Sequence, residues 1–206
     1  MKRRDVLRAG LFSIGGAGLA LARIGSAAAQ ADAGWATLFD GSNLDNWSPI
    51  GTANWKLADG ALVADNGSGF MVSKNDYGDF SLRAEFWIEA KANSGVFIRC
   101  TDASSVSSKT AYEVNIWDTR PEQDYATGAI PGVAKVDPMP HAADKWNLYE
   151  ITAKGDTLTV VLNGQTTVPG VHDGKFAKGR IALQHAKGLT DESGIVKFRK
   201  VQIKAL

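Results

Sequence analysis

The sequence predicts an all-β protein built as a two-sheet antiparallel jelly-roll sandwich, and three observations support this. Apolar and polar residues alternate along many short segments, as in strands with one buried face. Asn-Gly and Asp-Gly pairs separate some of these segments, which is typical of β-hairpins. No segment of the body keeps apolar residues at helical spacing for three turns. The body is long for a seven-strand immunoglobulin domain, so a jelly roll fits better.

The clearest expected strand is 81–88, in which Leu82, Ala84, Phe86 and Ile88 face one way and charged or aromatic residues face the other. This is the alternation of a half-buried strand. Further expected strands share β-prone composition and turn residues at their ends, and they cover residues 55–57, 61–63, 95–101, 111–117, 146–153, 157–162, 165–168, 180–184 and 196–203.

Two dipeptides predict tight hairpins. Asp59-Gly60 and Asn163-Gly164 each lie between two β-prone runs, and these residue types tolerate the positive φ angles of two-residue turns. The longest irregular segment is about 119–144, which carries four prolines. A loop of this length inside a compact domain is often functional.

The first 31 residues are expected to be a twin-arginine-type signal peptide, followed by one domain at 32–206. Basic residues at 2–4 precede an uncharged stretch at 9–22, and small residues follow. This order is that of a secretory signal, and the paired arginines resemble a twin-arginine signal. The stretch is shorter than the roughly 20 residues of a membrane span, so an uncleaved anchor is the weaker alternative. We expect a periplasmic or secreted protein with no membrane contact after cleavage.

Charge and cysteine content exclude several classes of function. The whole chain has a net charge of +1, but removing the first 29 residues leaves 18 basic and 21 acidic side chains, a net of −3. A mildly acidic body argues against nucleic-acid binding. The chain has one cysteine, Cys100, so no intrachain disulfide and no Cys-based zinc site is possible. We expect it to be a buried structural thiol.

One expected strand combines acidic, amide and aromatic side chains. Glu113, Asn115 and Trp117 lie at spacing two and therefore share a face, and Asp118 lies at the strand end. Two carboxylates beside an aromatic ring are a layout used to cleave sugars, and Trp rings stack on sugar faces. On these residues alone, a solvent-facing strand with ordinary charges explains the pattern better.

Two basic residues are further candidates. Arg99 is expected on the same side of its strand as Gly95 and Phe97, where it either neutralises an oxyanion or forms a surface ion pair. His185 follows the strand 180–184, where it either serves a cleft as a base or lies at the surface. The three histidines show no metal-binding spacing, so only the fold could assemble a histidine metal site.

Several blocks of the sequence resemble the 3-keto-disaccharide hydrolase domain family. The most specific is 93–99, Asn-Ser-Gly-Val-Phe-Ile-Arg, and 112–118 matches the family's Tyr-Glu-Val-Gln-Ile-Leu-Asp type of segment. The remaining blocks occur in the same order at 38–47, 55–62, 77–82, 127–130, 146–151 and 179–184. Together they span about residues 34–206, essentially the whole body.

The resemblance implies a concanavalin A-like or glucanase-like jelly roll with a concave ligand face. It implies a carbohydrate ligand and, in some relatives, cleavage of 3-keto-glycosides. Arg99, Glu113 and Asp118 fall on polar cleft positions of the family. His185 lies near a histidine of many relatives, but the loop that follows it departs from the family pattern.

The resemblance also implies four substrate-binding residues: Asn93, Asn115, Trp117 and Gln184. Asn115 stands where relatives usually have Gln, and Trp117 stands where they have an aliphatic residue. These changes either retune the sugar subsite or mark a member that binds without cleaving.

The implied chemistry follows from the substrate. A ketone at C3 acidifies the hydrogen at C2, so a base can remove it, the group at C1 can leave, and water can add afterwards. We expect Glu113 or His185 to be the base and Asp118 to orient a partner or protonate the departing oxygen. Arg99 or a bound divalent metal ion would stabilise the enolate. An oxidoreductase that forms the keto-sugar is an expected pathway partner.

Two other functions remain open. One is a non-catalytic carbohydrate-binding domain on the same fold, and the other is a secreted interaction or structural domain without a sugar ligand. Only the enzyme requires Arg99, Glu113, Asp118 and His185 to surround one hollow.

Overall fold

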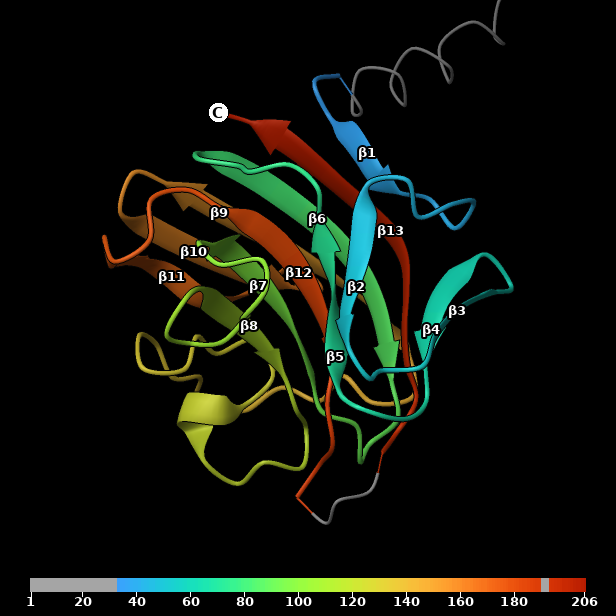
Figure 1. Cartoon of the computed structure of the whole chain (residues 1–206). Helices are drawn as coiled ribbons and strands as arrows, with labels where there is room; N and C mark the ends of the chain where they lie inside the picture. The colour runs from blue at the N-terminus through green and yellow to red at the C-terminus, as the bar shows by residue number, and fades with distance from the viewer. Residues whose placement is uncertain (1–32, 190–192) are drawn as a thin grey trace, which may run out of the picture. The chain divides into compact units, whose positions relative to one another are not determined.

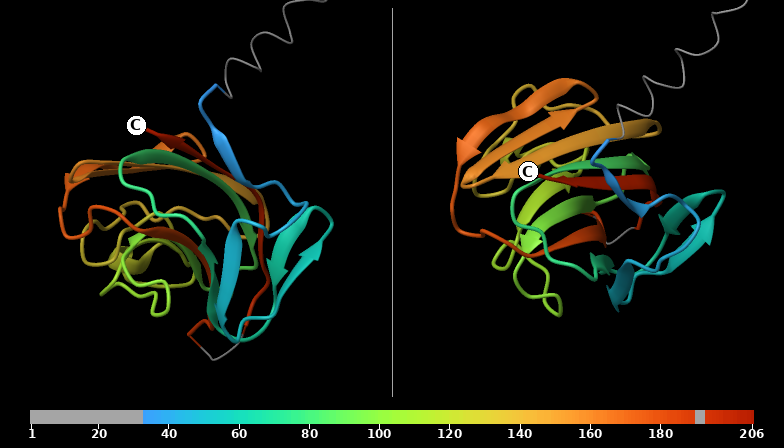
Figure 2. Two further views of the ribbon diagram at one scale, coloured as in Figure 1. Left: turned by 45° about the horizontal axis from the view of Figure 1, so that its top comes forward. Right: turned by 90° about the horizontal axis from the view of Figure 1, so that it is seen from above.

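The computed structural model describes residues 33–189 and 193–206 and consists of two antiparallel sheets packed face to face (Figures 1 and 2). The predicted signal peptide, residues 1–31, lies outside the described residues. The larger sheet has the strand order β11-β10-β9-β6-β13-β4-β3, with β1 also paired to β13. Its strands are β1 (Ala36–Phe39), β3 (Trp55–Ala58), β4 (Ala61–Ala64), β6 (Phe80–Ile88), β9 (Trp146–Lys154), β10 (Thr157–Leu162), β11 (Gln165–His172) and β13 (Val196–Ala205).

The smaller sheet has five strands in the order β2-β5-β12-β7-β8. They are β2 (Trp47–Gly51), β5 (Gly69–Ser73), β7 (Ser94–Cys100), β8 (Tyr112–Ile116) and β12 (Arg180–His185). Apart from strands, the described residues contain one short 3₁₀ turn at Gln123–Tyr125. None of their helices has the length and apolar character needed to span a membrane. The all-β, two-sheet prediction is therefore confirmed.

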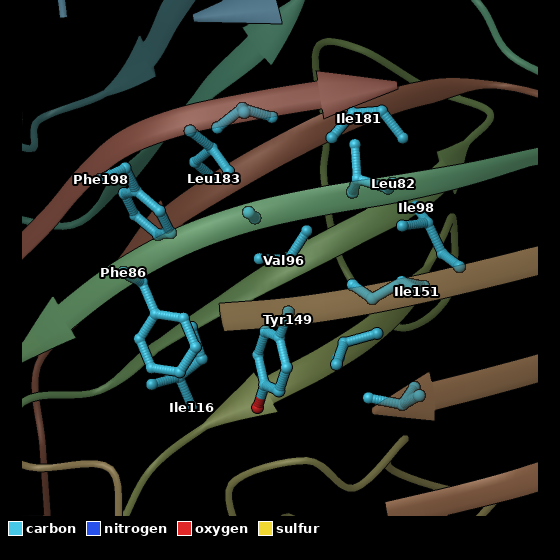
Figure 3. Packing of buried hydrophobic residues seen from close by; sticks show 14 of the residues in the cluster. Leu82, Phe86, Val96, Ile98, Ile116, Tyr149, Ile151, Ile181, Leu183 and Phe198 are labelled. Carbon is cyan, nitrogen blue, oxygen red and sulfur yellow. The ribbon is translucent and has the colours of Figure 1, made fainter. Parts of the chain in front are cut away.

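Alternation along the strands builds the core between the sheets. In β6, Leu82, Ala84, Phe86 and Ile88 are fully buried, and the residues between them are partly exposed, as predicted. Figure 3 shows side chains from both sheets meeting in this layer. The ring of Tyr149 packs 4.7 Å from that of Phe86, centroid to centroid. Burial of such apolar surface is the main force that holds the two sheets together.

Both predicted hairpin turns are present. Asp59-Gly60 joins β3 to β4 with φ angles of 51° and 71°, and Asn163-Gly164 joins β10 to β11 with 51° and 81°. Positive φ at both central positions is the geometry of a type I′ turn, which matches the twist of the strands.

A β-bulge in β7 interrupts the alternation at Arg99. The register between β7 and β12 shifts here, and Arg99 has a φ of 52°, in the left-handed region. The side chain consequently turns toward the larger sheet. Its guanidinium donates to the carbonyl oxygens of Gly78 (3.0 Å), Gly155 (2.7 Å) and Phe176 (3.1 Å), and it pairs with Asp79 at 2.9 Å.

Replacing Arg99 should therefore destabilise the fold. An Arg99→Lys variant keeps the charge but cannot reach these separate acceptors, and each buried carbonyl left unpaired costs about 1–3 kcal/mol. We expect guanidinium denaturation to show a loss of about 3 kcal/mol or more. The control is Arg83→Lys, because the exposed pair of Arg83 with Glu150 should contribute less than about 1 kcal/mol. Equal losses in the two variants would contradict this role.

Candidate functional site

The outer face of the smaller sheet, turned away from the larger sheet, carries an isolated carboxylate among apolar and amide side chains. We call it the Glu113 face and define it by Phe70, Gly95, Phe97, Glu113 and Gln184. Glu113 pairs in register with Phe97, and Gln184 pairs with Phe70. Neighbouring residues in these strands belong to the core between the sheets, so alternation directs the five outward.

Gly95 makes room for the side chain of Glu113. A Cβ atom on Gly95 would lie 3.1 Å from Oε1 of Glu113 and 3.2 Å from its Cγ. The carboxylate therefore reaches across β7 over the glycine. Since β12 lies on the other side of β7, this directs the carboxylate toward the strand that carries Gln184.

Burial is the only cause of the shifted pKa of Glu113. Desolvation raises the pKa of its carboxyl from 4.5 to about 7. Among residues 33–189 and 193–206, the carboxylate has no hydrogen bond or ion pair. Near neutral pH both the acid and the base form are therefore present, which suits a group that takes up and returns a proton.

Two buried polar atoms in the predicted site have no hydrogen-bond partner in the described part of the chain: Oε1 of Gln184 and Nε1 of Trp117. The first is an acceptor and the second a donor. Buried polar groups are normally paired, and unpaired ones need an explanation. A sugar hydroxyl can both donate and accept, so hydroxyl-rich ligands have the chemistry to satisfy both atoms.

Trp117 follows the end of β8, at the start of the long loop. Its backbone N–H donates to Oγ1 of Thr127 at 2.9 Å. The guanidinium of Arg120 lies 4.9 Å from the centroid of the Trp117 ring and 4.9 Å from that of Tyr125. This stack holds the ring by cation–π contacts. The sequence analysis missed Arg120, although its place three residues after Trp117 was visible.

Asp118 fastens the long loop, and its predicted role as a proton donor or orienting group is not supported. Its Oδ1 accepts from Oγ1 of Thr127 at 2.6 Å, and its Oδ2 accepts from the backbone N–H groups of Ala142 (2.6 Å) and Ala143 (2.8 Å). Asp118 thus ties the middle of the loop, at Thr127, and its end, at Ala142 and Ala143, to the end of β8.

The side-chain amides of two predicted substrate-binding residues, Asn115 and Asn93, also donate hydrogen bonds to backbone carbonyls. The side chain of Asn115 donates a hydrogen bond to the carbonyl of Tyr125, and Asn115 is only 1% exposed. The side chain of Asn93 donates to the carbonyl of Lys187 at 3.0 Å. Their positions flank the Glu113 face, but these contacts hold the adjacent loops.

Arg99 and His185 do not lie on the Glu113 face. The bulge turns Arg99 to the inner side, where four of its five N–H groups are bonded. His185 is fully buried on the inner side of β12, with Nδ1 2.9 Å from the carbonyl oxygen of Gly67 and Nε2 3.0 Å from that of Gly194. Both ring nitrogens thus face backbone carbonyl oxygens inside the molecule, away from the Glu113 face. The spacing of two between Leu183 and His185 already placed the histidine on the inner face.

The predicted convergence of Arg99, Glu113, Asp118 and His185 around one hollow is therefore wrong. Cys100 is buried as expected, but it belongs to a second apolar cluster with Phe97 rather than to the core between the sheets. The bulge beside it accounts for this change of side.

Two cavities border the Glu113 face. One, of about 260 Å³, is lined by Phe70, Ile50 and Val106, and the other, of about 300 Å³, lies beside Ala111 and Tyr112 at the edge of the sheet. Neither of these two cavities is lined by Glu113.

The residues around Glu113 do not fit a divalent metal ion. Stable metal sites combine several carboxylate, imidazole or thiolate ligands. Within residues 33–189 and 193–206 there is no cluster of three or more such side chains. The described residues around Glu113 therefore offer no ligand set for a divalent ion.

Comparisons with known proteins agree with this fold. The family model described as a 3-keto-alpha-glucoside-1,2-lyase-like domain matches residues 34–204. A candidate glycosyl hydrolase from Parabacteroides distasonis has a similar structure, with a TM-score of 0.74 and 18% identity over 86% of this chain and 96% of that one. Another from the same organism has a TM-score of 0.68 and 24% identity over 84% and 99%. No match was found among curated proteins.

Two further similar structures place the fold among jelly rolls. The carbohydrate-binding module CBM66 of Bacillus subtilis has a TM-score of 0.56 and 18% identity, over 84% of this chain and 96% of that one. The β-glucanase of Bacillus licheniformis has a TM-score of 0.59 and 12% identity over 84% and 97%. At these identities the likeness concerns the fold, and it confirms the predicted glucanase-like sandwich.

The raised pKa of Glu113 predicts a pH-dependent stability. The folded state holds the proton of the Glu113 carboxyl more tightly than the unfolded chain does, so protonation of Glu113 stabilises the fold. This stabilisation is complete below pH 4.5, the pKa in the unfolded chain, and is lost as the pH rises toward about 7, the pKa in the folded state. Between about pH 4 and about pH 8 the loss is roughly 3 kcal/mol. Glu113→Gln should remove that difference in urea unfolding, whereas Glu122→Gln, an exposed carboxylate, should leave it in place. An unchanged pH dependence in Glu113→Gln would refute the assignment.

Proposed function

The chain belongs to the 3-keto-alpha-glucoside-1,2-lyase-like domain family, and from this premise we propose that it is a carbohydrate-active enzyme that cleaves 3-keto-glycosides. The observation that carries the proposal is Glu113, an unpaired, desolvated carboxylate on the outer face of the smaller sheet. The names of the similar structures, which include glycosyl hydrolases and a carbohydrate-binding module, support a sugar ligand.

The reaction begins with proton abstraction. The ketone at C3 acidifies the C2 hydrogen, because the electrons left behind delocalise onto the ketone oxygen as an enolate. Ionised Glu113 takes this proton. A carboxylate with a pKa of about 7 is a stronger base than an ordinary glutamate and is still available at neutral pH.

Elimination and hydration complete the reaction. The enolate electrons form the C1–C2 double bond as the C1–O bond breaks, and the departing oxygen takes the proton from Glu113. Water then adds at C1, its hydroxyl forming the new C1–O bond and its hydrogen returning to C2. Glu113 serves as base and then as acid, so the chemistry does not require Asp118 or His185 to approach it.

Gln184 and Trp117 are the groups we assign to sugar binding. The unpaired Oε1 of Gln184 accepts a hydrogen bond from a hydroxyl, and the unpaired Nε1–H of Trp117 donates one. Phe70 and Phe97, whose rings meet edge to face at 5.2 Å, supply apolar surface beside the carboxylate. These contacts orient the substrate and reduce access of water.

One observation favours a second candidate, a non-catalytic carbohydrate-binding domain. Of the titratable groups predicted for catalysis, only Glu113 lies on the outer face, and a binding domain requires no more than that. The two functions differ in turnover, because a binding domain retains sugar affinity without releasing product.

Export and a pathway partner complete the proposal. The basic, apolar and small-residue order of residues 1–31 supports a periplasmic or secreted location. A 3-keto-glycoside arises by oxidation of a C3 hydroxyl, so an oxidoreductase of that class must supply the substrate.

The first test is activity on a 3-keto-glucoside. We expect the protein without residues 1–31 to release sugar and, in D₂O, to exchange the C2 hydrogen. The apparent pKa of kcat/KM should lie near 7, with activity rising as Glu113 ionises. Glu113→Gln should lower kcat/KM by about 10²- to 10⁴-fold, the usual contribution of a general base.

Asp59→Asn is the matched control, because it removes a carboxylate yet leaves an Asn-Gly sequence suited to the same turn. It should retain full activity. Assays with and without chelator and added divalent ions check the absence of a metal step. Full activity in Glu113→Gln removes Glu113 from the base role, and sugar binding without any release favours the binding domain.

The position of Glu113 can be tested through Gly95. In Gly95→Ala the new Cβ would crowd Oε1 and Cγ of Glu113, so the carboxylate must move from its place over β7. Displacement of a catalytic group by about 1 Å can cost about 100-fold, so a shift of a few tenths of an ångström should lower kcat/KM by about 2- to 10-fold. Gly78→Ala, whose Cβ would meet nothing within 4 Å, should not change activity. Equal activity of both variants would show that the carboxylate position is unimportant.

A further inference from the structure

The outer face of the larger sheet, on the opposite side of the sandwich, contains two adjoining cavities. They measure about 360 Å³ and about 170 Å³, and both are lined by Glu85 and Lys200. The larger extends to Asp40, and the smaller extends to Arg83 and Gln202. We call the two together the β13 groove, because residues of β13 line both cavities. This strand runs between β6 and β1 (Figure 1). Small-molecule sites typically occupy roughly 300–1,000 Å³.

A second β-bulge concentrates positive charge in this groove. The register between β13 and β6 shifts between Phe198 and Lys200, and Arg199 and Lys200 are both exposed. Regular alternation would place two successive side chains on opposite faces. The bulge instead leaves both cations on the outer side of the sheet, where both line the larger cavity.

The charges of the groove leave one cation without a partner. Glu85 pairs with Arg199 at 2.5 Å, and Glu150 pairs with Arg83 at 3.2 Å. Asp40, at the far end of the larger cavity, accepts two hydrogen bonds from Ser42. Lys200 forms no ion pair with any residue in 33–189 or 193–206. An ammonium between two cavities, with its acidic neighbours already paired, is free to bind an anionic group.

Gln202 provides a second polar group that a ligand in the groove can reach. It is only 6% exposed and lines the smaller cavity, yet its side-chain amide has no hydrogen bond within the described part of the chain. Its amide atoms are not among the fully buried side-chain atoms that lack a partner, so they face the cavity and are accessible to a ligand. Its N–H₂ can donate to an oxyanion and its carbonyl can accept from a hydroxyl.

An exposed aromatic ring favours a saccharide over a simple anion. Trp146 is 36% exposed, and the guanidinium of Arg199 lies 4.1 Å from the centroid of its ring. Arg199 thus connects the ring to the larger cavity. A sugar chain in the groove could place one residue against the indole and present its hydroxyls to the paired acids.

We propose that the β13 groove binds a carboxylate-bearing saccharide, such as a chain of uronic acid residues. Its carboxylate pairs with the ammonium of Lys200 and accepts from the amide of Gln202, and its hydroxyls bond to Glu85 and Glu150. This site is separate from the Glu113 face, so it would hold the protein on an acidic glycan without taking part in cleavage.

The test uses trigalacturonic acid and its methyl ester, in which methylation of the carboxyl groups removes their charge and leaves the sugar chain unchanged. Isothermal titration of the protein without residues 1–31 should show at least tenfold tighter binding of the acid. Lys200→Gln and Gln202→Leu should each weaken the binding of the acid at least tenfold. Lys204→Gln removes the same charge from the same strand outside both cavities, and it should change binding less than twofold.

Several outcomes would overturn the proposal. Equal binding of acid and ester, or no binding, excludes carboxylate recognition. An equal effect of Lys204→Gln and Lys200→Gln shows diffuse attraction to a basic strand, and equally tight binding of inorganic tripolyphosphate shows a general anion site. Glu113→Gln should bind trigalacturonic acid as the unaltered protein does, so failure of the proposed enzyme activity leaves this result independent.

Discussion

Burial of alternate side chains between the two sheets is the constraint on which the rest of the structure depends. Each strand presents one face to the shared core, so its intervening residues must face outward. That rule directs Glu113 and Gln184 to the outer face of the smaller sheet and Arg83 and Glu85 to the outer face of the larger one. The chemistry of both surfaces therefore follows from the packing of residues that take no part in it.

Several polar side chains that were predicted to be catalytic instead form hydrogen bonds with backbone groups. Arg99 and Asp118 each bind backbone groups from segments distant in sequence, and His185 lies between two carbonyl oxygens. Irregular segments of a sandwich carry backbone groups that have no sheet partner, and leaving them buried and unpaired is costly. Charged or polar side chains at these points hold the loops in place, which makes them important for folding and removes them from the surface.

The two outer faces differ in how their charges are balanced. Glu113 lies without a counter-ion among apolar and amide groups, so burial raises its pKa to about 7. In the β13 groove Glu85 and Glu150 are paired with arginines, Asp40 accepts hydrogen bonds from Ser42, and Lys200 has no ion-pair partner among the described residues. The first environment suits acid–base chemistry on a neutral sugar, and the second suits recognition of an acidic one.

The sequence by itself determined the all-β class, the strand 81–88, both type I′ hairpins and the outward position of Glu113, because each depends on local turn chemistry or on a period of two. It also carried the family resemblance. Only the tertiary structure decided the sides taken by Arg99 and Cys100, since a bulge reverses alternation and no local signal marks it. The partners of Asp118, Arg99 and His185 lie 9 or more residues away and come together only when the sheets pack. Whether a polar side chain is free for a ligand or bound to backbone is thus a property of the folded chain.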